Sequence, residues 1–388
     1  MINPALALVP NASRVCLGPA ETRRPITPDT RRPSQTGVEP CDAPASAAFL
    51  STARPRAVAT WLLLVAAMIV GIVIVGGITR LTNSGLSITE WKPITGIIPP
   101  LTLAQWQAEF ANYRQIPEYS QLNSGMTLDG FKAIFFWEYL HRALARTIGA
   151  AFAIPLLWFA LRRAIPVGYG WRLGALLALG ALQGAVGWWM VKSGLSVRTD
   201  VSHIRLAVHL MTALVTLAGI VWTALDLLAL HRSKLAAPAR LVPIAVTAFA
   251  LLFVQLVYGA FTAGLNAGYA FSSWPLMGDS LFPGGVPMLS PGWINAVDNP
   301  IVVQFIHRWL AFATAAGLVW LAVRATQHGS RAGFWVVGLV TLQVFLGIAT
   351  LMTGVAIPVA VAHQANAALL LIAMVFAAHR LGNPPKVL

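Results

Sequence analysis

Eight long apolar segments limit what this chain can fold into. Each is about 20 residues or longer, which is the length that an α-helix needs to cross a lipid bilayer. Only 10% of the 388 residues are charged, whereas a soluble domain carries about a quarter. We therefore predict an all-α, polytopic membrane protein. The predicted spans are residues 58–79, 131–161, 172–191, 203–230, 241–263, 301–323, 332–353 and 358–379.

The positive charges lie between these segments, so they indicate orientation and not a nucleic-acid-binding surface. The formal net charge is +14, and arginine and lysine gather in alternate connections. By the positive-inside rule, we expect both termini in the cytoplasm and the long loops, 80–130 and 264–300, outside. The expected location is the cell inner membrane, or the mitochondrial inner membrane in a eukaryote, with lipid as the surrounding partner.

The N-terminal region differs from the rest of the chain. Residues 1–55 are rich in proline and arginine and show no helical period, which predicts a disordered cytoplasmic tail. Both cysteines, Cys16 and Cys41, lie in this region. No Cys/His spacing suggests zinc, an iron–sulfur cluster or a disulfide framework.

An internal repeat divides the remaining chain into two units, which we predict at 56–235 and 236–388. Each unit has four spans, so both have the same orientation, as in parallel repeats. We therefore predict two tandem four-helix bundles. The matching stretches, in the same order in both units, are Thr79–Gly85 with Thr262–Gly268, His141-Arg142 with His307-Arg308, Leu182–Gly187 with Leu342–Gly347, and Ala207–His209 with Val361–His363.

Four histidines lie at similar predicted depths in alternate spans. They are roughly 5 to 10 residues past the outer boundary, or about 8–15 Å deep. Paired imidazoles with no thiol or carboxylate ligand fit axial ligation of haem iron better than a hydrolytic zinc site. The alternative, that each histidine is a polar residue that bonds a neighbouring helix, stays open. The four candidates are His141, His209, His307 and His363.

The other four histidines are expected to have no such role. We expect His231, His328 and His379 to be solvated at the cytoplasmic ends of their helices. His203 is expected to be interfacial at the outer end of its span.

Charged residues near the histidines suggest further roles. A guanidinium group suits a carboxylate, so Arg142, Arg308 and Arg80 are candidates to bind haem propionates. Snorkelling or packing roles stay open for them.

The two units differ at one informative position. Glu138 precedes His141 by three residues and so shares its helix face, whereas the counterpart of Glu138 is Gln304. A carboxylate can transfer protons and an amide cannot. We therefore expect the chemistry in the N-terminal unit and a permanent, electron-transferring haem in the C-terminal unit. A structural ion pair between Glu138 and Arg142 is the alternative.

A further set of ordered motifs covers most of residues 60–380. The motifs include Gly76-Gly77-x-Thr79-Arg80-Leu81-Thr82-x-Ser84-Gly85-Leu86-Ser87, Trp91-Lys92-Pro93-Ile94, Pro117-Glu118-Tyr119, Trp137-Glu138-Tyr139-x-His141-Arg142, Phe271-x2-Trp274-Pro275-Leu276-Met277, Gln304-Phe305-x-His307-Arg308 and Ala362-His363-Gln364. Together they resemble the haem A synthase family. Some bacterial members carry a cysteine pair in the first outer loop, and residues 80–130 contain no cysteine. The pattern resembles the subgroup of proteobacteria and mitochondria.

The resemblance implies a membrane oxidoreductase that converts a methyl group of haem O to a formyl group by successive hydroxylation, giving haem A for cytochrome oxidase. It implies that His307 and His363 ligate haem b, the cofactor. It also implies that His141 and His209 hold the substrate haem O and that Glu138 is the catalytic carboxylate.

The same resemblance implies haem O synthase, a farnesyltransferase, as a partner, and it leaves the electron donor open. The residues leave two alternative functions. A bis-histidine, quinol-linked cytochrome b is disfavoured because it has no use for an acid, Glu138, in one unit where the other unit has Gln304. A transporter is disfavoured because the histidines lie near one face of the membrane and not at its midplane.

Overall fold

The structure is a computed structural model that describes residues 52–92 and 95–383. Within these ranges the chain is helical and has no strand. Eight helices are long and apolar enough to cross a membrane, which confirms the all-α fold and the eight predicted spans. Of the predicted disordered tail, 1–55, residues 1–51 lie outside the part of the chain that the structure describes. The eight helices are α2 (Pro55–Leu81), α5 (Leu128–Leu161), α6 (Gly170–Lys192), α7 (His203–Arg232), α8 (Pro243–Gly264), α10 (Pro300–Gln327), α11 (Ala332–Met352) and α12 (Ile357–Gly382).

Proline and asparagine set several helix boundaries. Pro55, Pro243 and Pro300 occupy the first turns of α2, α8 and α10, where a missing N–H group costs no helical hydrogen bond. Just after α2 and α8, Asn83 and Asn266 have φ values of 48° and 55°. Asparagine tolerates this left-handed conformation better than most residues. The two asparagines occupy matching positions of the internal repeat, so both helices end in the same way.

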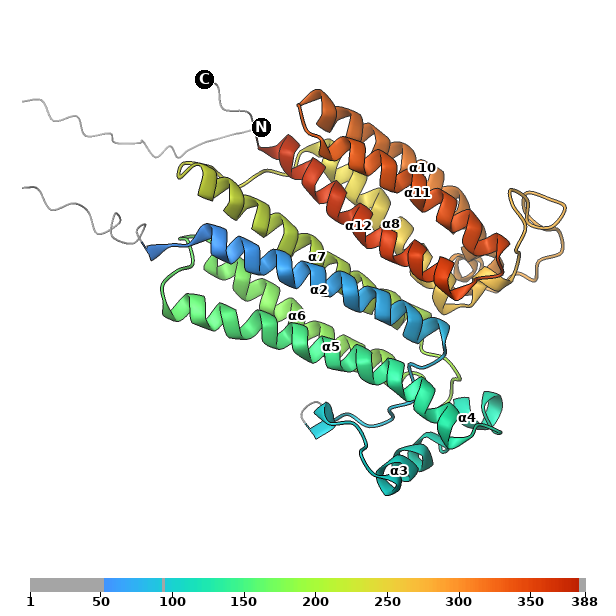
Figure 1. Ribbon diagram of the computed structural model, residues 1–388. Coiled ribbons are helices and arrows are strands. Elements are labelled where there is room, and N and C mark those ends of the chain that lie inside the picture. The colour runs from blue at the N-terminus through green and yellow to red at the C-terminus, as the bar shows by residue number, and fades with distance from the viewer. Residues whose placement is uncertain (1–51, 93–94, 384–388) are drawn as a thin grey trace, which may run out of the picture. The chain divides into compact units, whose positions relative to one another are not determined.

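The long helices pack in two sets, as Figure 1 shows. In the first set α2 packs against α5 and α7, and α6 packs against α7. In the second, α10 packs against α8 and α11, and α11 packs against α12. Helix α7 of the first set contacts α8 and α12 of the second, and α2 contacts α12. One apolar core runs through both sets. This packing is consistent with the predicted tandem bundles.

The connections 82–127 and 265–299 lie at one end of the helices, which we call the long-loop side. The first holds α3 (Leu103–Tyr113) and α4 (Pro117–Leu122), and the second holds α9 (Asn295–Asp298). Aromatic side chains pack α3 and α4 onto the start of α5; Phe110 stacks on Phe131 with ring centroids 5.0 Å apart. The first turns of α5 therefore belong to a folded loop layer and not to the apolar span.

The opposite, short-loop side contains a buried charge cluster that joins three helices. The carboxylate of Asp226 on α7 is fully buried. It accepts hydrogen bonds from Arg172 of α6 at 2.7 Å and from His379 of α12 at 2.9 Å. His379 is 4% exposed, so the expectation of a solvated histidine was wrong. The reason is that the ring packs against Trp222 and bonds Asp226, both on α7.

We expect Asp226→Ala to lower the free energy of unfolding by about 3 kcal/mol, because it leaves buried charged and polar partners unpaired. Thermal unfolding of the purified protein in detergent measures this. Asp129→Ala is the matched control, since Asp129 pairs with Lys132 at 3.0 Å but its side chain is 90% exposed. Equal effects of the two variants would show that the buried cluster contributes no more than an exposed ion pair.

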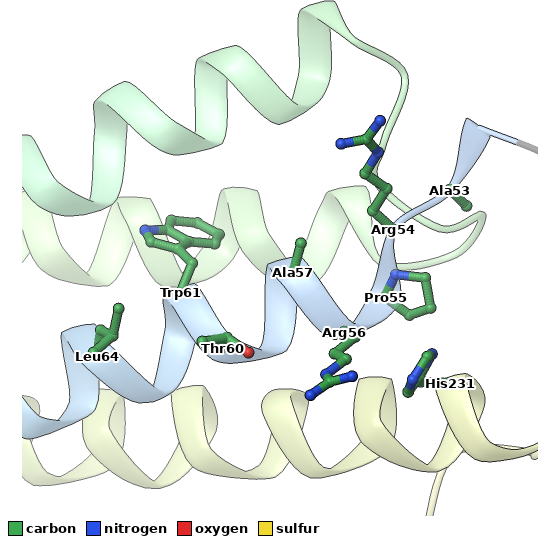
Figure 2. A pocket seen from close by; sticks show the side chains of 9 residues that line it. All are labelled: Ala53, Arg54, Pro55, Arg56, Ala57, Thr60, Trp61, Leu64 and His231. Atoms are coloured by element: carbon green, nitrogen blue, oxygen red, sulfur yellow. The ribbon is translucent and has the colours of Figure 1, made fainter.

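A pocket of about 670 Å³ also lies on the short-loop side, at the first turns of α2. Figure 2 shows Arg56 and His231 near one another at its rim, and Trp61 turned towards another helix. Trp61 donates a hydrogen bond to the main chain of Ala151 at 2.7 Å. The candidate histidines lie towards the other end of the helices, so this pocket is not part of their site.

Candidate functional site

Each of the four candidate histidines packs against a glycine of a neighbouring helix. Each glycine is five residues before the last residue of its helix, since the helices end at residues 81, 192, 264 and 352. At 1.5 Å per residue, all four rings lie about 7.5 Å inside the long-loop ends of those helices. The pairs are His141 with Gly76 of α2, His209 with Gly187 of α6, His307 with Gly259 of α8, and His363 with Gly347 of α11.

The glycines are needed because the rings approach the backbone closely. A Cβ atom at Gly187 would lie 2.9 Å from Cε1 of His209, and at the other three glycines it would lie 3.1 Å from the same ring atom. These distances are shorter than ordinary carbon–carbon contacts. A larger residue at any of these positions would displace its histidine.

Glutamines hold two of these rings in the same manner. The amide nitrogen of Gln183 is 3.1 Å from Nδ1 of His209, and that of Gln255 is 3.1 Å from Nδ1 of His307. Each amide also donates to the main-chain oxygen of its histidine at 3.0 Å. The glutamine therefore orients both the ring and the backbone that carries it.

A third glutamine repeats the contact, and the fourth position lacks one. Gln343 lies 3.2 Å from Nδ1 of His363, and Asn366 donates to the Oε1 atom of this glutamine at 2.7 Å. Nδ1 of His141 is buried and has no hydrogen-bond partner among the described residues.

The N-terminal pair has a spacing that suits a metal ion. The ring centroids of His141 and His209 are 6.5 Å apart. Two metal–nitrogen bonds of about 2 Å, with about 1 Å from each nitrogen to its ring centre, span about 6 Å. Among the described residues, no group of three or more His, Cys, Asp or Glu could hold a metal ion. A pair without a third ligand fits axial ligation of haem iron.

Glu138 lies one turn before His141, and its carboxylate is fully hydrogen-bonded. Oε2 accepts from the Ser87 hydroxyl at 2.7 Å and from the Ile88 N–H at 2.8 Å. Oε1 accepts from Nη2 of Arg142 at 2.7 Å and from its Nε at 3.1 Å. The expected alternative, an ion pair with Arg142, is thus present. The same carboxylate also anchors the first long loop.

The C-terminal unit has a matching anchor of opposite polarity. Gln304 donates to the main-chain oxygen of Phe271 at 3.1 Å. Arg308 donates to the same oxygen at 2.8 Å and to that of Ser273 at 2.9 Å. The loop therefore presents a carbonyl group to Gln304, whereas the first loop presents an N–H group to Glu138.

The three candidate arginines bind main-chain oxygens on the long-loop side. Arg142 donates to Ile88 at 2.8 Å, as Arg308 does to Phe271. Arg80, near the end of α2, donates to Ala263 of α8 at 2.9 Å. All three hold long-loop segments or helix ends together.

Sequence reasoning missed some of this site. The matching stretches Leu182–Gly187 and Leu342–Gly347 each contain a Gln-x3-Gly spacing, and the same spacing at Gln255 and Gly259 of α8 was not recognised. His203, expected to be interfacial, is buried, with Nε2 3.1 Å from Asp298, because the second long loop covers it.

Glu118 of α4 is a further buried acid near Glu138. It is 2% exposed, and its Oε2 atom has no hydrogen-bond partner among the described residues. Burial raises the pKa of the Glu118 carboxyl to about 8; the charges of Asp200 and Glu138 add to the rise, and Arg80 opposes it. At neutral pH this carboxyl holds its proton in the folded chain.

A pH dependence of stability follows for the first long loop. The folded pKa of Glu118 lies above its ordinary value of 4.5, so the folded chain binds this proton more tightly than the unfolded chain. From about pH 5 to about pH 8, stability should fall by up to about 1.4 kcal/mol per pH unit. Glu118→Gln should flatten this profile, measured by thermal unfolding, whereas Glu90→Gln, at a half-exposed side chain, should not. A profile that Glu118→Gln leaves unchanged contradicts the assignment.

Comparisons with known proteins identify the family of the chain. A family model described as "Cytochrome oxidase assembly protein", COX15-CtaA, matches residues 59–375. A protein named "Heme A synthase" from Rhizorhabdus wittichii is 57% identical over 332 residues, covering 85% of this chain and 96% of its own. One of the same name from Sphingopyxis alaskensis is 55% identical over 331 residues, covering 85% and 93%. The family model spans most of the chain and both relatives are identical to it at more than half of the aligned positions, so the chain belongs to the COX15-CtaA family of cytochrome oxidase assembly proteins.

Proposed function

We propose that this chain is a haem A synthase, a membrane oxidoreductase that converts haem O to haem A. The curated relatives of that name, at 57% and 55% identity over most of the chain, support the reaction. The observation that carries the assignment to this site is the set of four glycine-cradled histidines at one level of the helices. This arrangement suits two haem groups, one for each helix set.

The C-terminal pair is assigned to a permanent haem b. His307 and His363 are each held by a glutamine and cradled by a glycine, so both rings are fixed from two sides. Two fixed imidazoles would hold haem b, and the bound haem would supply one-electron chemistry. This unit has Gln304 where the N-terminal unit has Glu138. An amide cannot transfer protons, so the unit suits electron transfer better than oxidation of the substrate.

The N-terminal pair is assigned to the substrate. His141 and His209 would hold haem O, and Glu138 would act as the proton acceptor or the stabiliser of developing positive charge. The bonds from Ser87, Ile88 and Arg142 keep the carboxylate in one place. A fixed carboxylate needs little reorganisation during the reaction.

The three candidate arginines would bind haem propionates. Arg142, Arg308 and Arg80 place permanent positive charge on the long-loop side, where haem propionates would lie. Their guanidinium groups also bind main-chain oxygens, so a propionate would share or replace those bonds. The units 56–235 and 236–388 would each hold one haem.

The chain is a multi-pass membrane protein, and we propose the inner membrane with both termini cytoplasmic. The alternation of basic connections supports this orientation. Haem O synthase is the proposed source of substrate. The competing function, a bis-histidine cytochrome b, accounts for the histidines but gives Glu138 no chemical role.

Expression in a host that makes haem O but not haem A tests the reaction. Haems are extracted from membranes and separated by chromatography. We expect haem A, or its hydroxylated precursor, only in cells that carry this chain. Cells that accumulate the protein in the membrane but contain haem O alone would rule the reaction out.

A further inference from the structure

Three of the four histidine rings share one clamp, and the fourth lacks it. The clamp is a glutamine four residues before the cradling glycine, as in α6, α8 and α11. In α2 the matching position, four residues before Gly76, is Ile72. Residues four apart lie on the same helix face, so Ile72 occupies the clamp position for His141 without a polar group.

The clamp restricts the ring. The amide nitrogen of Gln183 is 3.1 Å from Nδ1 and 3.4 Å from Nε2 of His209. Gln343 lies 3.2 Å and 3.4 Å from the same atoms of His363. An amide this close to both ring nitrogens packs against the ring and opposes its rotation. A side chain that packs on a ligating histidine in this way fixes the orientation of the ring.

His141 has only its glycine cradle. Its Nδ1 atom is buried and has no hydrogen-bond partner among the described residues, so no polar contact at that atom holds the ring. The other ring of its pair, 6.5 Å away, is clamped. The N-terminal pair is therefore asymmetric, whereas both members of the C-terminal pair are clamped.

We propose that His141 is the histidine that releases the haem iron, and that Ile72 is the positioning residue that makes release possible. The inference rests on the proposed function, because it divides roles within the haem O site. His209 keeps its bond, and the position vacated by His141 opens in the helix set that carries Glu138. The haem b pair stays closed on both sides.

Carbon monoxide binding to the reduced, purified full-length protein tests this, because the gas reports an axial position that is open or easily vacated. In wild-type protein loaded with haem O, we expect one of the two haem sites to bind it. Ile72→Gln adds the missing clamp and should lower the affinity for carbon monoxide by about tenfold or more. Gln183→Leu frees His209 and should increase binding.

Ile74→Gln is the matched control. It adds the same amide to α2, but two residues along, which is about 200° around the helix. We expect its affinity for carbon monoxide to equal that of the wild type.

Two results would overturn the proposal. One is a wild-type protein that binds no carbon monoxide; the other is an Ile72→Gln variant with wild-type affinity. If Ile72→Gln does not fold, Gln183→Leu decides, and unchanged binding overturns the proposal. Haem A production by wild-type cells is measured in parallel. Its absence rejects the proposed function, whereas the binding result concerns His141 alone.

Discussion

Glu138→Gln is expected to abolish conversion of haem O while the protein stays folded and loaded with haem. The amide keeps the shape of the carboxylate, and its oxygen can still accept from the Ser87 hydroxyl and the Ile88 N–H group. It cannot accept a proton or stabilise positive charge as a carboxylate does. We expect a loss of about 10²–10⁴-fold in conversion rate, measured by haem extraction, with an unchanged optical spectrum of bound haem b.

Ser87→Ala separates chemistry from loop anchoring. It removes one of the four hydrogen bonds to Glu138 and leaves the charge, which Ile88 and Arg142 still hold. If the carboxylate does the chemistry, this variant should lose less than about tenfold in rate, the equivalent of about 1.4 kcal/mol. Equal losses in Ser87→Ala and Glu138→Gln would instead make Glu138 a loop anchor.

His363→Ala is expected to remove the low-spin, b-type haem signal from the purified protein. The substitution deletes one axial ligand and leaves a cavity beside Gly347, and Gln343 loses the ring that it clamps. A single remaining histidine cannot supply both of the nitrogen ligands on which the low-spin signal depends. His307→Ala should have the same effect. Optical and electron paramagnetic resonance spectra of the reduced and oxidised protein measure this.

His203→Ala is the control for these two variants. His203 is also a buried histidine of the long-loop side, but it pairs with Asp298 at 3.1 Å and contacts Phe261. Its removal should leave the low-spin signal in place. A signal that survives both His307→Ala and His363→Ala would place haem b elsewhere in the chain.

The helices and their polar residues were predictable, because each depends on local sequence. A run of 20 apolar residues has few other solutions than a spanning helix, and all eight spans matched. The distance in residues from each histidine to the predicted outer boundary of its span showed that the four histidines lie at a similar depth. The resemblance to a known family depended on ordered motifs, and the comparisons with relatives confirmed it.

Contacts between distant segments were not predictable in this way. Gln255 and His307 are 52 residues apart in sequence, and no periodicity states which helices face one another. His379 shows the same limit, since its place near a helix end indicated its depth but not that α7 covers it. The hydrogen bond from the Ile88 N–H group to Glu138 depends on the conformation of the first long loop. The spacing of apolar residues does not encode that conformation.

The measurement that tests the account most directly is the haem content of the purified wild-type chain. We assign one permanent haem b to His307 and His363 and one exchanging haem O substrate to His141 and His209. Extraction and chromatography should therefore yield about one haem b per chain, together with haem O or its hydroxylated and formyl products. Two haem b groups per chain, with no haem O or product, would contradict it and make the protein a cytochrome b.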